Sequence, residues 1–357
     1  MTTSRTWVDS AVRKIDADFN RTSDTHLFRL DVPGVPGVSL YLKDESTHPT
    51  GSLKHRLARS LFLFAICNGW VGPETTIVEA SSGSTAVSEA YFAKLLGLPF
   101  VAVIPASTSP EKISQIEFHG GSVHLVDDPT RLHKEAHHLA REVGGHFMDQ
   151  FTYAERVTDW RGNNNIADTI FEQMAQEECP VPAWIVCGAG TGGTSATIGR
   201  YSRYQGFDTK ICVVDPENSV FYDFFHTGNC LLSCDKGSRV EGIGRPRVEA
   251  SFVTTVIDEM IKVPDAASYA ALRYLEHALS RKFGGSTGTN MIGAAQIMAR
   301  MAANGEKGSV VTLICDPGDR YLDTYYNDAW LAENGYDIAP FEGQLEHFHQ
   351  TGEWVEA

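Results

Sequence analysis

The sequence lacks both a long apolar run and an apolar leader. Its longest apolar run, Leu61 to Cys67, is too short to span a bilayer. The stretch from Met1 to Ser10 has no apolar core of the kind that a signal peptide contains. We therefore expect neither a membrane-spanning segment nor a leader peptide.

The sequence also lacks paired cysteines. Its seven cysteines are scattered without a CxxC pair, and no second pair accompanies Cys230 and Cys234 to complete a zinc site. This usage is typical of reduced thiols in a cytoplasmic protein. We expect a cytoplasmic location and no metal centre.

Basic residues are in the minority. The chain has 30 lysines and arginines against 45 acidic residues, which gives a net charge of −15 and a pI near 5.3. This balance argues against a nucleic-acid or anionic-membrane partner. A length of 357 residues with 42% hydrophobic residues is enough for two ordinary domains or one large one.

Short β-rich runs alternate with helical patterns along the chain. This alternation predicts parallel βαβ units, and so an α/β fold of open, mostly parallel sheets flanked by helices. The expected strands are 27–30, 39–43, 75–80, 100–104, 123–126, 183–187, 210–215 and 309–315, and the expected helices include 86–96, 110–119, 130–143 and 290–304. Residues 1–22 are expected to form a helix, and 216–247 to be irregular.

The segment Pro49–Leu57 contains a candidate catalytic lysine. A Pro-Gly turn leads to Ser52, a natural N-cap, and places Lys54 in the first turn of a helix. The helix dipole there, and the neighbouring Arg56, disfavour an ammonium group. Lys54 is therefore better placed as an amine that forms a Schiff base with a carbonyl, although a surface lysine would give the same pattern.

A glycine loop follows the expected strand 183–187. Gly188–Thr194 (Gly-Ala-Gly-Thr-Gly-Gly-Thr) fits the dinucleotide pattern G-x-G-x-x-G, and Asp215 ends the next strand. An NAD-dependent Rossmann oxidoreductase is thus one hypothesis. Thr191 and Thr194 add hydroxyls to the bare amides, which favours a terminal phosphate monoester at a helix N-terminus.

One cofactor would use both motifs. Pyridoxal phosphate needs an amine for its aldehyde, amides for its phosphate and a partner for its ring nitrogen. Ser286, within Phe283–Gly288, is a candidate for the third role.

With these motifs the chain resembles the fold-type II pyridoxal-phosphate enzymes, in the branch of the cysteine synthases and cystathionine β-synthases. The resemblance covers about residues 40–325 and lies in the segments Pro49–Lys54, Ser81–Thr85, Asp149–Phe151, Gly190–Thr194, Glu241–Gly244 and Gly284–Ser286. It implies a two-domain fold like that of the tryptophan synthase β subunit. The expected domains are a smaller one over 44–160 and a larger one over 1–43 plus 161–357.

The resemblance also implies roles for individual residues. Lys54 is the expected catalytic residue and cofactor lysine. Further cofactor-binding residues are Ser84, Gly190, Thr191, Gly192, Gly193, Thr194 and Ser286, and the expected residues for the substrate carboxylate are Ser81, Ser82, Gly83, Thr85 and Gln150.

Some positions depart from the usual family pattern. Ser84 stands where an asparagine is usual, His55 replaces an aspartate after the lysine, and the Asn-Pro that usually follows Gln150-Phe151 is missing. The chain looks most like the cysteine desulfhydrases of the bacterial and fungal Cds1 type. The expected reaction is β-elimination of L-cysteine to hydrogen sulfide, ammonia and pyruvate in a homodimer. A β-replacing cysteine synthase or cystathionine β-synthase, using the same aminoacrylate, is the alternative.

Overall fold

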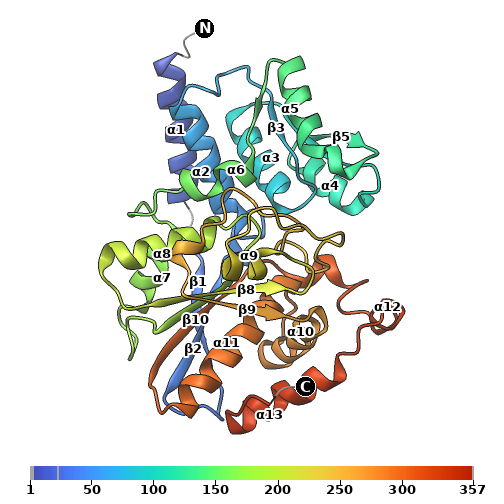
Figure 1. Ribbon diagram of the computed structural model, residues 1–357. Helices are drawn as coiled ribbons and strands as arrows, with labels where there is room; N and C mark the ends of the chain where they lie inside the picture. Colours follow the sequence, from blue (N-terminus) through green and yellow to red (C-terminus); the bar gives the residue numbers. More distant parts are fainter. Residues whose placement is uncertain (1–3, 22–23, 356–357) are drawn as a thin grey trace. The chain divides into compact units, whose positions relative to one another are not determined.

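The computed structural model describes residues 4–21 and 24–355, which divide into two compact units. The first unit consists of the described part of Met1–Asp24 and of His48–Thr158. The second consists of Thr25–Thr47 and the described part of Asp159–Ala357. Each is an α/β unit with its own sheet (Figure 1), so the predicted fold class is confirmed.

The first unit contains a four-stranded, all-parallel sheet. Its strand order is β5-β4-β3-β6. In chain order its elements are α1 (Arg5–Asn20), α2 (Lys54–Cys67), β3 (Ile77–Glu79), α3 (Ser84–Leu96), β4 (Phe100–Pro105), α4 (Pro110–Phe118), β5 (Ser122–Val126), α5 (Leu132–Glu142), β6 (His146–Phe147) and α6 (Gln150–Val157).

Helix α1 belongs to this unit, which corrects a prediction. The domain boundaries read from the sequence placed residues 1–43 with the larger domain. The helix instead packs on α2 and α3, and its Ala11 and Ile15 are fully buried in their apolar core. A helix goes to the core that buries its apolar face, and neither the core nor the helix's partner can be read from the order of elements along the chain.

The second unit contains a six-stranded sheet in the order β1-β2-β10-β7-β8-β9. Only β1 and β2 pair antiparallel in it. Its elements are β1 (His26–Leu30), β2 (Val38–Asp44), α7 (Ile166–Met174), β7 (Trp184–Gly188), α8 (Gly193–Gln205), β8 (Lys210–Pro216), α9 (Phe221–Thr227), β9 (Glu259–Val263), α10 (Asp265–Leu279), α11 (Gly285–Ala303), β10 (Gly308–Ile314), α12 (Asp328–Glu333) and α13 (Ala339–Thr351).

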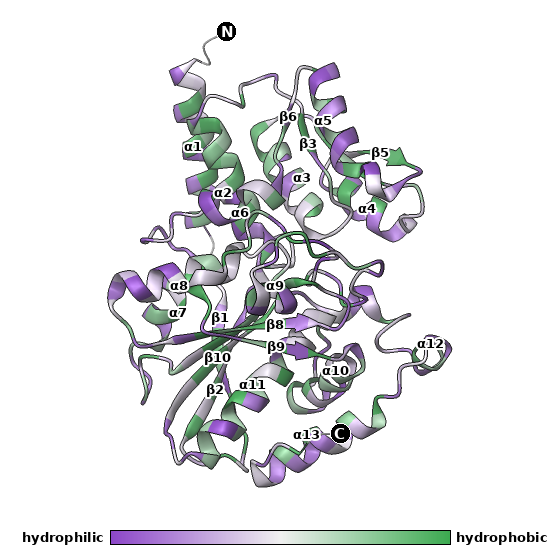
Figure 2. Ribbon diagram, in the orientation of Figure 1, coloured by the Kyte–Doolittle hydropathy of each residue, from purple (hydrophilic) through white to green (hydrophobic). Residues whose placement is uncertain are grey.

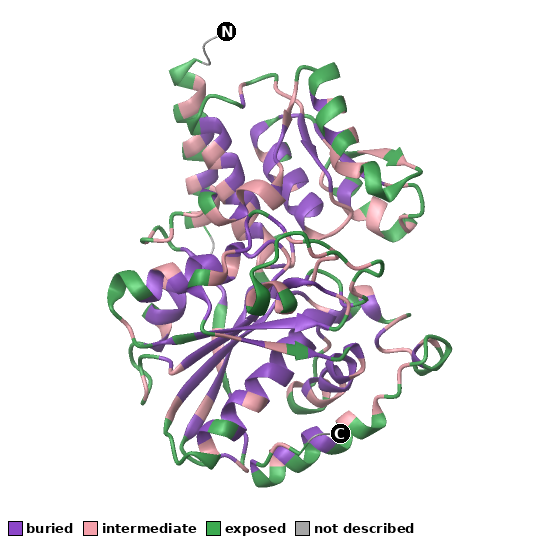
Figure 3. Ribbon diagram, viewed as in Figure 1, coloured by how far each residue is buried: buried purple, intermediate pink, exposed green. Residues whose placement is uncertain are grey.

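Apolar residues gather on the central strands of this sheet and on the helices against it. Figure 2 shows hydrophobic residues along β8 and β10, and Figure 3 shows that the central strands of the sheet are buried; β7 is buried as well. Strands buried on both faces read as continuous apolar runs, as Ile185–Cys187 and Ile211–Val214 do. No helix within residues 4–21 and 24–355 is long and apolar enough to cross a membrane.

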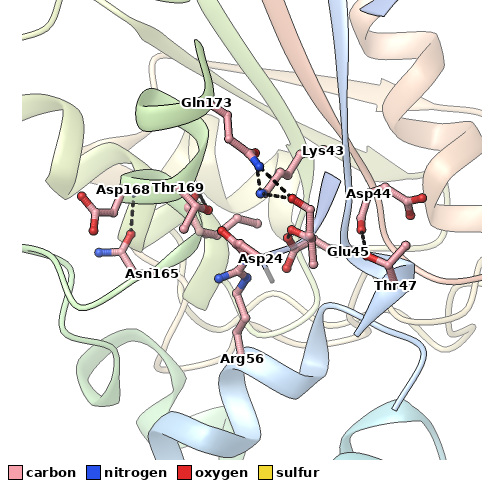
Figure 4. A network of polar contacts seen from close by, with 12 residues as sticks. Asp24, Lys43, Asp44, Glu45, Thr47, Arg56, Asn165, Asp168, Thr169 and Gln173 are labelled. Atoms are coloured by element: carbon pink, nitrogen blue, oxygen red, sulfur yellow. Dashed lines mark hydrogen bonds and ion pairs between the residues drawn. The ribbon is translucent and has the colours of Figure 1, made fainter. Parts of the chain in front are cut away.

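A buried lysine joins strand β2 to helix α7. Lys43 is fully buried, and its Nζ donates to Gln173 Oε1 at 2.7 Å and to Thr25 O at 2.9 Å. Figure 4 shows Lys43 beside Gln173 in this network. Thr25 in turn donates to Glu45 Oε1 at 2.7 Å. A buried ammonium is tolerated only with such partners, so this contact ties α7 to the sheet.

Glycine allows helix α11 to approach the sheet closely. A Cβ on Gly293 would lie 2.2 Å from Val214 Cγ1 and 3.1 Å from Val186 Cγ1, both in the core. We expect Gly293→Ala to lower the free energy of unfolding by about 1–3 kcal/mol, because the added methyl overpacks the helix–sheet contact. Urea denaturation followed by circular dichroism measures this.

Gly343→Ala in α13 is the matched control, since its Cβ would meet nothing within 4 Å. It should leave stability unchanged or raise it by about 0.5–1 kcal/mol through helix propensity. Equal stabilities of the two variants would contradict this account of the α11 contact.

Candidate active site

Lys54 is the first residue of helix α2, as the sequence predicts for the first turn. The side chain is half-buried, and Ser52 Oγ accepts the Lys54 backbone N–H at 3.3 Å. The expected N-cap is off by one residue, since Leu53 takes that place with helical backbone angles. No acidic residue lies in the first turn of α2. The helix dipole therefore still favours a neutral amine at this position.

The second cation of this turn is neutralised. Arg56 pairs with Asp24 at 2.6 Å, and both belong to the first unit. From the sequence alone, Arg56 is expected to repel a charged Lys54. An ion pair at this distance reduces that repulsion, so the helix terminus is the stronger of the two effects.

His55, one of the departures from the family pattern, points into the first unit. It is 6% exposed, and its Nδ1 lies 3.1 Å from Thr50 Oγ1, which lies 2.8 Å from Ser88 Oγ on α3. Its ring stacks on His48 and contacts Phe92. The imidazole therefore fixes the turn before Lys54 against helix α3.

The expected carboxylate loop opens helix α3. Gly83 is the N-cap, the first turn contains no acidic residue, and Ser81 Oγ accepts the Gly83 N–H at 3.3 Å. Thr85 Oγ1 donates to Gln150 Oε1 at 2.8 Å, so two of the predicted substrate residues touch. A helix N-terminus with nearby hydroxyls and an amide is suited to a carboxylate.

In the second unit, the glycine loop joins β7 to α8. Gly192 is the N-cap of α8 with φ of +85°, a conformation that glycine adopts without strain. Gly193 donates its N–H to Thr191 Oγ1 at 3.3 Å, and Ser251 donates its hydroxyl to Thr191 O. The first turn of α8 lacks an acidic residue, so its amides favour an anion.

A second loop lies against this glycine loop. Gly244 donates its N–H to Ala189 O at 2.8 Å, and a Cβ on Gly190 would lie 2.3 Å from Gly242 O. The segment Glu241–Gly244, which the resemblance placed near the substrate, therefore borders the expected phosphate loop. The wider segment 216–247 is less irregular than predicted, because it contains α9.

Ser286 lies in the first turn of α11 and is 3% exposed. The sequence predicted a turn here and a helix from residue 290, but the helix begins at Gly285. The Cys315 N–H donates to Thr287 Oγ1 at 3.1 Å, and Asn290 Nδ2 donates to Leu313 O at 2.9 Å. Ser286 thus lies at the carboxyl end of β10, the same sheet edge as the glycine loop after β7.

One observation in the second unit fits a polar ligand at this edge. Ile243 approaches the glycine loop closely, since a Cβ on Gly188 would lie 2.8 Å from Ile243 Cγ2, and the same Cβ would lie 3.4 Å from Asn290 Oδ1. That oxygen is buried and has no hydrogen-bond donor among the described residues. Ligands of open α/β sheets bind at the carboxyl ends of the strands, where these groups converge.

The acid expected for a dinucleotide ribose is engaged elsewhere. Asp215 is fully buried, and its Oδ2 accepts the Tyr222 N–H of α9 at 2.8 Å. Burial raises the pKa of this carboxyl to about 6. Asp215 therefore fastens α9 to the end of β8.

A family model described as pyridoxal-phosphate dependent enzyme matches residues 20–316. The chain belongs to this family. Pyridoxal phosphate is therefore the cofactor, as the motifs predicted, and the NAD hypothesis is set aside.

Relatives of this pyridoxal-phosphate dependent enzyme match most of its length. L-cysteine desulfhydrase Cds1 of Mycobacterium tuberculosis is 57% identical, with 99% of this chain and 97% of the relative covered. An N-(2-amino-2-carboxyethyl)-L-glutamate synthase of Ralstonia nicotianae is 29% identical over 83% of this chain and 84% of the relative. The crystal structure of O-ureido-L-serine synthase has a TM-score of 0.74 and 26% identity, with 86% and 96% covered.

Several residues around these loops escaped the sequence reasoning. Asn290 and Ser251 are distant in sequence from the glycine loop, and the fold brings both residues next to it. No sequence motif marks either of them. Glu79 and Glu89 are fully buried glutamates beside the carboxylate loop. A glutamate that ends a β-branched strand, as Glu79 does, was the one available signal. Charged residues are almost never fully buried without a reason.

Proposed function

We propose that this enzyme is an L-cysteine desulfhydrase, which converts L-cysteine and water to hydrogen sulfide, ammonia and pyruvate. The observation that supports this most is the 57% identity, along 99% of the chain, to L-cysteine desulfhydrase Cds1. Fold alone would not distinguish the activities of this family.

The cofactor-binding residues of this proposal are those that the family resemblance implies. Pyridoxal phosphate, when bound, supplies an aldehyde that reacts with amines and a ring that accepts electrons from a substrate carbon. Lys54 would hold the aldehyde, and the amides and hydroxyls of Gly190–Thr194 would hold the phosphate. Ser286 would face the ring nitrogen, and Ser84 the ring oxygen.

The loop at the start of α3 would bind the substrate carboxylate. The residues concerned are Ser81, Ser82, Gly83 and Thr85, together with Gln150. The Thr85–Gln150 hydrogen bond presents a hydroxyl and an amide side by side, and the first-turn amides of α3 add donors. Holding the carboxylate orients the Cα–H bond of the amino acid for proton removal.

The Lys54 amine is the base in this proposal. Its Nζ takes the proton from Cα of L-cysteine, the Cβ–S bond breaks, and sulfur leaves as sulfide. Cβ of the resulting enamine takes up a proton, water adds to the imine carbon, the nitrogen leaves as ammonia, and pyruvate remains. The hydroxyl of Ser286 is neutral, which favours prompt loss of the leaving group over transamination.

A β-replacement reaction is the second candidate. O-ureido-L-serine synthase shares the fold at a TM-score of 0.74 and 26% identity. In such a reaction a thiol or sulfide, rather than water, would react after the sulfur has left. The residues that bind the amino acid would be the same.

The assay of the purified holoenzyme with L-cysteine alone separates the two candidates. We expect pyruvate, ammonia and sulfide in equal amounts, because water is the only other reactant. A parallel reaction with homocysteine tests replacement. If L-cysteine alone gives no pyruvate while O-acetylserine and sulfide are turned over rapidly, the desulfhydrase proposal fails.

Assembly and location follow as finer parts of the proposal. We expect a homodimer, as the family resemblance implies, acting on a small amino acid in the cytoplasm. The free cysteines, all seven of which lie among the described residues, support a reducing compartment. The net charge of −15 supports the absence of a nucleic-acid partner.

A further inference from the structure

Two glutamates are completely buried in the first unit. Glu79 ends strand β3 and Glu89 lies in helix α3, and both are 0% exposed. Neither pairs with a lysine or arginine in the part of the chain that the structure describes. Burying a carboxylate without a cation is costly, so this pair needs a different explanation.

Glu79 is connected to the residues that would bind the substrate carboxylate. Its Oε1 accepts the Ala80 N–H at 2.7 Å, and its Oε2 accepts the Gln150 N–H at 3.2 Å. The Gln150 side chain in turn accepts the Thr85 hydroxyl at 2.8 Å. Glu89 follows Thr85 by one helical turn, so both lie on the same face of α3.

The carboxyl of Glu89 is fully buried next to that of Glu79, which acts on its pKa. No N–H or O–H donor of the described chain reaches either of its oxygens. Two carboxylates offer no donor to each other, so a hydrogen bond between them requires a proton on one. Burial raises the pKa of Glu79 to about 8, and burial beside Glu79 raises the pKa of Glu89 well above its usual value.

The turn that Glu79 holds is strained. Asp149 has φ of +49°, in the left-handed region that non-glycine residues avoid. Its neighbour Gln150 begins helix α6, and the bond from Gln150 N–H to Glu79 anchors that position. Such strain persists only where the surroundings over-determine the conformation.

We infer that Glu79 and Glu89 share a proton and act as positioning residues, holding Gln150 and Thr85 in place for the carboxylate of the amino-acid substrate. The inference rests on the proposed function in that Gln150 and Thr85 bind this carboxylate. The shared proton has two effects. It supplies the bond between the glutamates, and it removes negative charge from behind an anion-binding loop.

Substitution of Glu89 tests the shared proton. Glu89→Leu keeps the size and removes the donor, so KM for L-cysteine should rise about tenfold while kcat changes much less, because a hydrogen bond to a charged group is lost. Glu89→Gln restores an N–H donor and should recover most of the affinity. Glu117→Leu, an exposed glutamate in α4 of the same unit, is the control and should leave KM unchanged.

The pH profile separates positioning from a purely structural role. Because burial raises the pKa of Glu79 to about 8, we expect the pair to hold its shared proton below that pH. Above that pH the pair loses the proton, and its second negative charge lies behind the carboxylate-binding residues, with Asp149 as the other acidic group nearby, so KM should rise. Glu79→Gln cannot ionise, and the ratio of wild-type to Glu79→Gln KM should therefore increase between pH 7 and 9. The substrate's own titration cancels in that ratio.

Calorimetric binding of L-alanine to the holoenzyme distinguishes failure of this inference from failure of the proposed function. L-alanine carries the same carboxylate but no leaving group. A wild type that leaves L-cysteine unchanged would end the desulfhydrase proposal, and L-alanine affinities would still report on the pair. Equal affinities in wild type, Glu89→Leu and Glu89→Gln, or a pH-independent KM ratio, would overturn the inference. If Glu89→Leu does not fold, the pH dependence of the ratio of wild-type KM to Glu79→Gln KM tests the inference.

Discussion

Replacing Lys54 by alanine should lower kcat for L-cysteine by at least about 10³-fold, because one amine is both the proposed covalent anchor of the cofactor and the proposed base for the Cα proton. The cofactor should no longer be attached to the chain. Borohydride reduction followed by mass spectrometry of the peptide around residue 54 measures that attachment, and steady-state kinetics measures kcat.

A second substitution at this position separates charge from nucleophilicity. Lys54→Arg keeps a cation at the start of α2. A guanidinium does not deprotonate at the pH of the assay, so it forms no Schiff base with the cofactor. We therefore expect Lys54→Arg to be as inactive as Lys54→Ala. Lys134→Ala, on the exposed face of α5, is the matched control and should retain full activity. Either Lys54 variant with a tenth of wild-type kcat would refute the assignment of this lysine.

Adding a single methyl group at Gly190 should weaken cofactor binding by about 10²-fold or more, since overpacking displaces the loop that would hold the phosphate. The Cβ of Gly190→Ala would lie 2.3 Å from Gly242 O, a backbone atom that cannot move by itself. One of the two loops must shift, and the amides of the glycine loop shift with it. Titration of the apo-protein with pyridoxal phosphate, followed by absorbance, gives the dissociation constant.

Gly237→Ala is the control for this loop, because its Cβ would meet nothing within 4 Å in the same unit. It should bind the cofactor as wild type does. Should Gly190→Ala fail to fold, Thr194→Val removes a loop hydroxyl at nearly constant volume and should weaken binding about tenfold. Full cofactor occupancy in both variants would show that Gly190–Thr194 does not hold the phosphate.

Local motifs of this protein could be predicted because backbone requirements are written in adjacent residues. The glycine loop is one example, since Gly192 adopts a positive φ immediately before helix α8. The strand–loop–helix order around it was predicted within a residue or two. Lys54 is another example, because a turn and a helix start are both short-range features.

Helix α11 shows where such patterns fail. Its residues from Gly285 to Met298 are buried on nearly every side, so the helix has no polar face. Periodicity between apolar and polar faces is the main helical signal, and here it is absent. The prediction therefore began the helix at residue 290 and left Ser286 in a turn, although Ser286 lies in the first helical turn.

The sequence by itself determined the α/β class, the lysine at the start of α2, the glycine loop and, through its family resemblance, the cofactor. These depend on neighbouring residues or on motifs in a fixed order. Only the tertiary structure decided that α1 belongs to the first unit, that Gly242 closes on Gly190, and that Glu79 meets Glu89. The reason is that burial and the sharing of a proton arise between segments distant in the chain, and a lone glutamate in a sequence gives no sign of either.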